Sequence, residues 1–558
     1  GHHHQDLAIS PIHLQLGVFQ GDPLSVLVFN TVMNTMVDTI TKEHSALGYR
    51  SDASRSRTNL LQYADDTSLL ADGPSSCQTL LTVIEAWLSW SGMKANVPKC
   101  VCLAIQASTA KPYDPKLMLD GQQIPFIGDT TFHFLGALVN ISGTNTPRED
   151  LCEKLTTLLQ KVDATLLSRQ QKLLLYKMAI IPRLTWDLSI SDLPISWLQN
   201  TLQPIATRFL KRWSGLARSA DPNRLFLPKS NGGLELSHIV TTYKKIHAAK
   251  AGSFMCSRDS VVRAIATQDT LQEASRKRSV FRPHQEVVEV MSEDPGATKK
   301  RVVDRVKAKI QAEDTSSRLA HTTSLQVQGL TVREFKGRAA QNWSTAIHSL
   351  PEWHFKFALN AVTDSLPHNA NLYKWKKLSS PKCQLCGEYQ SLAHILNSCQ
   401  KALELRRYNT RHDDVLSVIF KFAKNHMLPE FQITADLPGT YSFPQDIAAT
   451  DQRPDIVLWS SKAVYLMELT VPFETNMAAA AARKALRYED LRVACSRTHH
   501  TTVITLEVGS RGYLGMEGLQ ELYQLLRPKA KDRRAFEVDI TRHVIAASYD
   551  IWCKRNWL

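Results

Sequence analysis

The segment CQLCGEYQSLAHILNSC at residues 383–399 constrains local folding more than any other stretch of this chain. It carries three cysteines and one histidine in the pattern Cys383-x2-Cys386-x7-His394-x4-Cys399. Three thiolates and an imidazole can complete a tetrahedron around Zn²⁺. Because all four ligand positions are filled, we expect a structural zinc site whose folding depends on the metal. The alternative is a set of buried, unpaired cysteines beside a surface histidine.

The length of 558 residues exceeds what one hydrophobic core can organise, so the chain is expected to form several domains. Its 67 Lys and Arg outnumber 53 Asp and Glu and give a net charge of +14, which suggests polyanionic partners. The ten cysteines are mostly scattered, which favours a reducing, intracellular compartment. The sequence contains no run of about 18 apolar residues, so it predicts no membrane span. The opening GHHHQDLAIS has no initiating Met, so we expect a fragment.

Hydrophobic periodicity predicts a multidomain protein with α/β and all-α parts. Helical spacing is clearest at 75–92 and throughout 150–252, whereas turns separate short apolar runs elsewhere. The predicted divisions are a mixed α/β segment at 1–142, a helical segment at 143–252, a basic and partly helical connector at 253–345, the Cys/His module with flanking helices at 346–425, and a second α/β domain at 426–558.

The segment LLQYADDTSLL at 60–70 predicts a strand, a tight turn and a second strand, with Asp65 and Asp66 at the tip. Two such charges about 5.5 Å apart repel by roughly 3 kcal/mol at an effective dielectric constant of about 20. If the apolar flanks bury, the pair therefore needs a cation, and carboxylate oxygens suit Mg²⁺. An exposed Asp-Asp turn is the alternative.

The segment RPDIVLWSSKAVYLMELTVPFE near the C-terminus places Asp455 before one apolar strand and Glu468 within the next. A hairpin of this length can bring both carboxylates to one metal ion. A lone buried carboxylate in an apolar strand costs several kcal/mol unless it is paired. An outward-facing Glu468 is the alternative. In the following helix, Lys484 and Tyr488 are four residues apart and share a face.

Four ordered segments resemble the palm motifs of reverse transcriptases: GVFQGDPLSVLVFN at 17–30, YADD at 63–66, GMKANVPKC at 92–100 and FHFLG at 132–136. The later segments LLLYKMAIIPRLTW and NGGLEL are similar to the thumb of non-LTR retrotransposon enzymes. The resemblance implies a partial polymerase palm and a helical thumb. Phe19 and Val26 depart from the usual palm pattern, and the palm's other metal-binding Asp lies on an upstream strand that this sequence does not contain.

In that family, the first Asp of YADD helps to hold two Mg²⁺ ions during nucleotidyl transfer. The resemblance gives this role to Asp65, a supporting role to Asp66 and a tight turn at the primer grip to Gly136. It also implies contacts to template, nucleotide or triphosphate from Gln20, Gly21, Lys94 and Lys99. Without the upstream Asp, the polymerase half is expected to be incomplete.

The C-terminal half is similar to the site-specific, R-two-type class that carries a CCHC module and a restriction-like endonuclease. The resemblance assigns Mg²⁺ binding to Asp455 and Glu468. Restriction-type nucleases usually carry the catalytic Lys where Thr470 stands, so Lys484 takes that role, with Tyr488 as a further candidate. The basic residues after the Cys/His module are expected to contact phosphates, with a solvated helix face as the alternative: Arg406, Arg407, Arg411 and His412.

Taken together, the motifs predict an N-terminally truncated piece of a retrotransposon polyprotein. The expected activities are an incomplete RNA-directed DNA polymerase and a Mg²⁺-dependent DNA endonuclease that serve target-primed reverse transcription. An RNA template and target DNA are the implied partners, Mg²⁺ and Zn²⁺ the implied cofactors, and the nucleus the implied location. The competing hypothesis is a decayed or co-opted protein that binds nucleic acid without catalysis.

Overall fold

The computed structural model describes residues 19, 21–50, 57–128, 130–140, 143–144, 147–275, 280–438 and 443–557. The described residues form a mixed α/β protein with two compact units. One unit lies within Gly1–Arg148, Asp187–Leu193 and Ile246–Val306, and the other within Glu149–Trp186, Pro194–Lys245 and Lys307–Leu558. The five-part division remains a prediction. None of the helices in the described part of the chain is long and apolar enough to cross a membrane.

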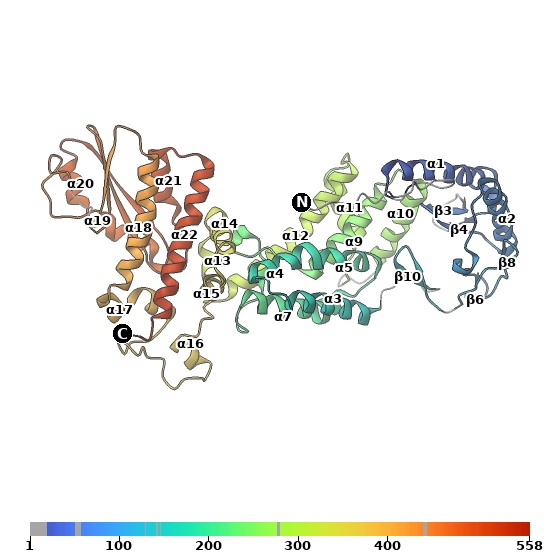
Figure 1. Ribbon diagram of the computed structural model, residues 1–558, viewed down its shortest axis with the longest axis horizontal. Helices are drawn as coiled ribbons and strands as arrows, with labels where there is room; N and C mark the ends of the chain where they lie inside the picture. The colour runs from blue at the N-terminus through green and yellow to red at the C-terminus, as the bar shows by residue number, and fades with distance from the viewer. Residues whose placement is uncertain are drawn as a thin grey trace, which may run out of the picture. The chain divides into compact units, whose positions relative to one another are not determined.

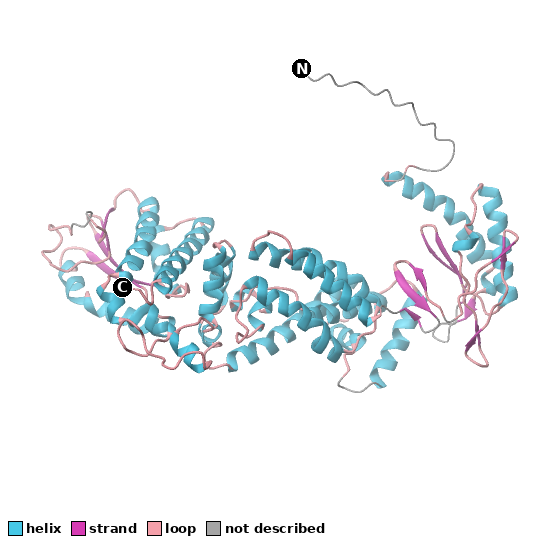
Figure 2. Cartoon of the chain, turned by 60° about the horizontal axis from the view of Figure 1, so that its bottom comes forward, coloured by secondary structure: helices cyan, strands magenta, loops and turns pink. Residues whose placement is uncertain are grey.

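The N-terminal α/β part combines two long helices with short strand pairs and a three-stranded sheet (Figure 2). Helix α1 (Pro23–Asp38) begins with Pro23 after the capping side chain of Asp22, which accepts a hydrogen bond from the Leu24 amide. Helix α2 (Pro74–Ser91) confirms the helix predicted at 75–92. The strands are β1 (Tyr49–Arg50), β2 (Arg57–Thr58), β3 (Leu60–Tyr63), β4 (Asp66–Leu69), β5 (Ile105–Gln106), β6 (Lys111–Pro112), β7 (Met118–Leu119), β8 (Gln122–Gln123), β9 (Phe132–Phe134), β10 (Ala137–Asn140) and β11 (Gly143–Thr144).

Helices occupy most of the chain between Thr144 and Gln432, and no named strand occurs among the described residues there. They are α3 (Arg148–Asp163), α4 (Arg169–Leu175), α5 (Ile181–Ile190), α6 (Ile195–Trp197), α7 (Gln203–Ser214), α8 (Asn223–Phe226), α9 (Ile239–Met255), α10 (Ser260–Ser275), α11 (Pro283–Glu293), α12 (Lys299–Ser324), α13 (Leu330–Glu334), α14 (Gly337–His348), α15 (Glu352–Val362), α16 (Asn369–Lys374), α17 (Gln400–Glu404) and α18 (Arg407–His426).

The connector expected at 253–345 is more helical than its composition suggested, because α10 to α14 fill most of its described residues. Val287 and Val290 in α11, and Val302 and Val306 in α12, are buried at helical spacings of three and four. Such sparse apolar stripes are enough to bury one face of a helix.

The C-terminal α/β part is built on a four-stranded sheet with the order β12-β13-β14-β15. Its strands are β12 (Gln432–Ala435), β13 (Ile456–Trp459), β14 (Ala463–Thr470) and β15 (His500–Glu507). The first three are antiparallel neighbours, and β15 is parallel to β14. A parallel neighbour needs a crossover, which α19 (Met477–Arg487) and α20 (Glu489–Cys495) supply. Figure 1 shows α19 and α20 on one side of the strands and α21 (Met516–Leu526) and α22 (Ala530–Cys553) on the other.

The alternation of side chains along β14 determines which of its residues face the crossover helices α19 and α20. Val464 and Leu466 are fully buried in a cluster with Leu491 and Cys495 of α20. Because side chains two residues apart share a sheet face, Glu468 continues this apolar row at the end of the strand. The Glu468 carboxylate therefore lies in the interior between β14 and α19.

Candidate functional site

Asp455 and Glu468 face each other at the open end of the β13–β14 hairpin, away from its turn. The antiparallel register pairs Ile456 with Met467, so the next pair outward is Asp455 with Glu468. The amide of Asp455 donates to Glu468 Oε1 at 3.0 Å, and the amide of Leu469 donates to Asp455 Oδ2 at 2.7 Å. Each carboxylate is therefore held by the backbone of the opposite strand.

Lys484 of α19 completes the pairing of these two acids. Its Nζ lies 2.7 Å from Glu468 Oε2 and 3.4 Å from Asp455 Oδ2. The Glu468 side chain has 0% exposure, so it does not point outward from the sheet. The structure thus brings together the three residues that the sequence assigned to one site.

The electrostatic balance of the site follows from burial and from these partners. Burial, together with the Asp455 charge, raises the pKa of Glu468 to about 7. Burial also opposes ionisation of Asp455, but hydrogen bonding and charge from His412, together with Lys484, lower its pKa overall. Two buried carboxylates beside one ammonium group favour a further cation, and their hard oxygens fit the preferences of Mg²⁺.

Tyr488 supports the site through the backbone. Its ring is buried with 1% exposure, and its hydroxyl donates to the Arg453 carbonyl at 2.9 Å. Arg453 itself forms an ion pair with Asp436. Tyr488 therefore braces the segment that leads into Asp455.

His412 lies beside Asp455, a contact that the sequence analysis did not predict. It was predicted to contact phosphates as part of a basic run, but its Nε2 lies 3.3 Å from Asp455 Oδ2. Its side chain is 25% exposed. The sequence carries no signal for this contact, because 43 residues separate the two positions and no shared strand or helix links them.

The three arginines of the same basic run have different environments. Arg406 is exposed, with a φ of 56° before α18. Arg407 donates to the carbonyls of Lys554 at 2.7 Å and Trp557 at 2.6 Å.

Arg411 is 2% exposed, which contradicts its predicted contact with a phosphate. It donates to Val471 O at 3.1 Å and to Ser548 Oγ at 3.3 Å. Burial lowers the pKa of its guanidinium to about 10. Arg411 anchors α18 inside the protein. Of the three arginines, Arg406 is the exposed one.

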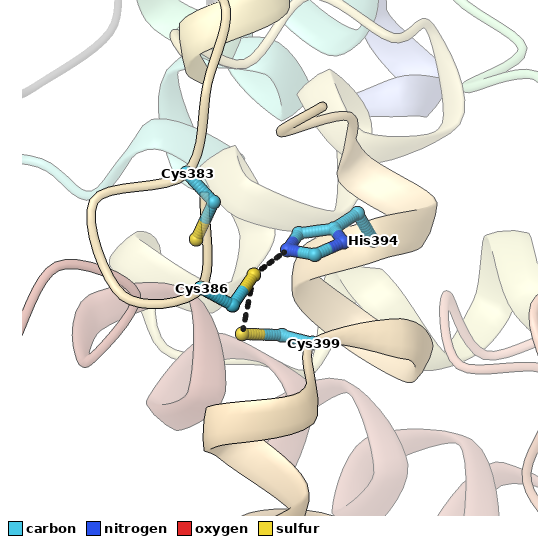
Figure 3. Close-up of side chains that lie close together, drawn as sticks. All are labelled: Cys383, Cys386, His394 and Cys399. Atoms are coloured by element: carbon cyan, nitrogen blue, oxygen red, sulfur yellow. Dashed lines mark hydrogen bonds between the residues drawn. The ribbon is translucent and has the colours of Figure 1, made fainter. Parts of the chain in front are cut away.

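The Cys/His segment folds into one four-membered cluster (Figure 3). The ligand atoms of Cys383, Cys386, His394 and Cys399 all lie within 4.8 Å of one another. Cys386 Sγ lies 3.3 Å from His394 Nε2 and 3.8 Å from Cys399 Sγ. Two sulfurs bound about 2.3 Å from a tetrahedral Zn²⁺ would be about 3.8 Å apart, so the donor set and its spacing fit zinc. The convergence argues against the alternative of unrelated cysteines and a surface histidine.

The cluster is packed against the C-terminal α/β domain. Asn397, between His394 and Cys399, donates from Nδ2 to the Val471 carbonyl at 2.8 Å. Tyr408 of α18 accepts from the Cys399 amide at 3.0 Å and donates to the Ile395 carbonyl at 3.0 Å. These bonds connect the Cys/His loop to β14 and α18.

The YADD segment forms the predicted hairpin, with β3 and β4 paired from Leu60–Leu69 to Tyr63–Asp66. Ala64 adopts a φ of 53° at the turn. The prediction that the flanks bury is only partly right, because Leu60 is 8% exposed but Leu61 is 54% and Tyr63 69% exposed. Asp65 and Asp66 are both exposed, as the alternative of a solvent-facing turn expects.

The roles of the other predicted polymerase residues stay predictions. Lys94 and Lys99 are exposed, and among the described residues no side-chain hydrogen bond joins either to Asp65 or Asp66. Gly21 and Gly136 have positive φ values of 98° and 74°, which favour glycine at both positions. The predicted residue Gln20 lies outside the described residues.

Comparisons with known proteins bear on both halves of the chain. Residues 5–139 match the family described as reverse transcriptase (RNA-dependent DNA polymerase). The chain is 29% identical over 226 residues, 39% of its length, to the retrovirus-related Pol polyprotein from type-2 retrotransposable element R2DM of Drosophila melanogaster, of which this covers 20%. It is 24% identical over 419 residues, 74% of its length, to the Pol polyprotein from type-1 retrotransposable element R2 of Popillia japonica, of which this covers 63%. A corresponding R2 polyprotein of Nasonia vitripennis is 25% identical over 270 residues, 47% of this chain and 25% of the relative.

These matches confirm the resemblance to reverse transcriptases of R2-type retrotransposable elements. The chain contains a segment of the reverse transcriptase family and is related to the Pol polyproteins of R2 retrotransposable elements. It spans less than two thirds of the length of each of these curated relatives.

Proposed function

We propose that the C-terminal α/β domain of this chain is a metal-dependent endonuclease that nicks DNA within a retrotransposon polyprotein. The observation that carries the proposal is the convergence of Asp455, Glu468 and Lys484 at the end of one hairpin. A structural ion pair alone does not need a second buried carboxylate, whereas metal-dependent phosphodiester cleavage uses metal-binding oxygens beside a cationic side chain.

The roles follow from the contacts of each side chain. Asp455 and Glu468 would hold Mg²⁺, which when bound supplies Lewis-acid activation of the scissile phosphate and of water. Lys484, 27% exposed, can reach both the acids and solvent, so it would orient the attacking water or stabilise the charge that develops on the phosphate. The two backbone amides fix the carboxylates before any ligand arrives.

The polymerase assignment rests on the reverse-transcriptase match at residues 5–139. We propose that the complete polyprotein copies an RNA template from a nicked DNA end, with Asp65 and Asp66 in the palm. The contacts among Asp455, Glu468 and Lys484 make the endonuclease the activity that we expect this chain to perform by itself. Because the proposed substrate is genomic target DNA, we place its action in the nucleus.

The Cys/His cluster would hold a structural Zn²⁺. Four filled ligand positions leave no open site for catalysis. Its bonds to Val471 and Tyr408 would make it part of the endonuclease scaffold.

The endonuclease proposal is tested by measuring Mg²⁺-dependent nicking of a supercoiled plasmid by the full chain. Asp455→Ala and Glu468→Ala should each reduce nicking by at least about 100-fold, since the site would lose a metal ligand. Asp451→Ala is the matched control, because this exposed acid lies four residues before Asp455. Equal nicking by all four proteins would refute the proposal, and retained DNA binding would then favour the non-catalytic alternative.

A further inference from the structure

Three hydrogen-bond donors converge on one oxygen of Asp455. The Leu469 amide lies 2.7 Å from Oδ2, His412 Nε2 lies 3.3 Å from it, and Lys484 Nζ lies 3.4 Å from it. Among the described residues, no hydrogen bond reaches Oδ1. A carboxylate oxygen that already accepts three donors is a poor ligand, so this arrangement leaves Oδ1 as the oxygen for a metal ion.

His412 reaches this position because both ends of α18 are anchored. Next to it, Arg411 binds the Val471 carbonyl just beyond β14 and the Ser548 hydroxyl of α22. Further along α18, Phe422 stacks on Phe536 of α22 with ring centres 3.8 Å apart. The packing of α18 therefore holds the His412 imidazole next to Asp455.

We propose that His412 is a positioning residue of the endonuclease, which orients Asp455 so that Oδ1 faces the bound metal ion. Because a carboxylate only accepts hydrogen bonds, His412 acts through the proton on Nε2. This inference rests on the proposed endonuclease function. This role differs from the phosphate contact that the sequence suggested for His412, which stays a prediction.

The test measures Mn²⁺ binding to the full chain by electron paramagnetic resonance, together with nicking in Mg²⁺. His412→Ala should raise the Mn²⁺ dissociation constant roughly tenfold, the order of effect expected when the partner of a metal ligand is lost. His412→Gln should restore binding to within about threefold, because its amide nitrogen can replace the Nε2 donor. Asp455→Ala defines the binding that other sites contribute.

The matched control is His543→Ala, since this half-exposed histidine of α22 also lies beside a carboxylate, Asp539, at 3.6 Å. Thermal unfolding of each variant shows whether it folds. In nicking assays, His412→Ala should raise the Mg²⁺ concentration for half-maximal rate while leaving KM for DNA unchanged.

The outcomes separate the two proposals. Mn²⁺ binding by His412→Ala equal to wild type overturns the positioning role, as does a raised KM for DNA with unchanged Mg²⁺ dependence. Failure of His412→Gln to restore binding also overturns it. If wild type and Asp455→Ala bind Mn²⁺ alike and neither nicks DNA, the endonuclease proposal itself fails.

Discussion

Asn397 donates a hydrogen bond of 2.8 Å to the carbonyl of Val471, three residues beyond Glu468. This bond joins the short helical segment His394–Ser398 to the residue that follows β14, the strand that carries Glu468. Arg411 donates to the same carbonyl at 3.1 Å. The Cys/His cluster and the paired acids therefore share one backbone anchor.

We predict that Asn397→Ala weakens nicking by roughly tenfold while the zinc content remains near one ion per chain. Removing the donor leaves the zinc ligands intact but loosens the exit of β14, at a cost of about 1 kcal/mol in the free energy of unfolding. Zinc content by atomic absorption, nicking rate and thermal unfolding check the prediction. Ser398→Ala is the control, because this exposed neighbour lies next to the zinc ligand Cys399. Loss of zinc from Asn397→Ala would contradict the separation of the two roles.

Lys484→Met should abolish nicking and, without added Mg²⁺ or Ca²⁺, destabilise the protein by about 2 kcal/mol, since it leaves two buried acids without their ammonium partner. Addition of Ca²⁺ should recover part of the lost stability, because the acids can then bind a cation. Arg483→Met removes a charge from the adjacent exposed position and serves as control. The measurement is urea unfolding at pH 8 with and without added Ca²⁺. Identical unfolding of Lys484→Met and Arg483→Met without added Ca²⁺ would show that Asp455 and Glu468 do not need an ammonium partner for stability.

Local patterns in the sequence were sufficient to predict the hairpin of Asp455 and Glu468. Alternation fixes which side chains of β14 point inward, and a short loop between β13 and β14 fixes the register. The helix after the hairpin then placed Lys484 within reach. The Cys/His cluster was predictable for the same reason, because all its ligands lie within 17 residues.

Contacts between distant segments were not predictable in this way. Arg411 and His412 are neighbours in a basic run, yet one is buried against α22 and the other lies beside Asp455. The environments of these two side chains depend on how α18 packs on the sheet and on α22. No local sequence pattern encodes that packing. The exposed Leu61 of the YADD hairpin is a second case, since alternation cannot say whether a strand face is covered.

Removal of one partner of the buried ion pair of Glu474 and Arg511 should strongly destabilise the C-terminal domain. Arg511 donates to Glu474 from its amide and from Nε, both at 2.7 Å, and the two side chains are 0% and 3% exposed. Glu474→Gln should lower the free energy of unfolding by about 3 kcal/mol, because the guanidinium stays buried without its charge partner. Glu489→Gln breaks the exposed pair with Arg492 and should leave the unfolding midpoint unchanged. Denaturant unfolding compares the two variants, and equal midpoints would refute the expected difference.

The stability of the unit that contains His348 should fall below pH 6.5 because this side chain is held neutral. Burial, helped by the charges of Lys229 and Lys177, lowers the pKa of His348 from 6.5 to about 4. Between these two values the unfolded chain binds more protons than the folded one, so the stabilising contribution is complete above pH 6.5 and is lost as the pH falls toward 4. From pH 7.5 to pH 5, wild type should lose about 2 kcal/mol more than His348→Gln, which cannot take up a proton. Urea unfolding across this range measures the difference, with His543→Gln as the control for a half-exposed histidine. Parallel pH profiles for wild type and His348→Gln would mean that the folded protein accepts the charged imidazole at no cost.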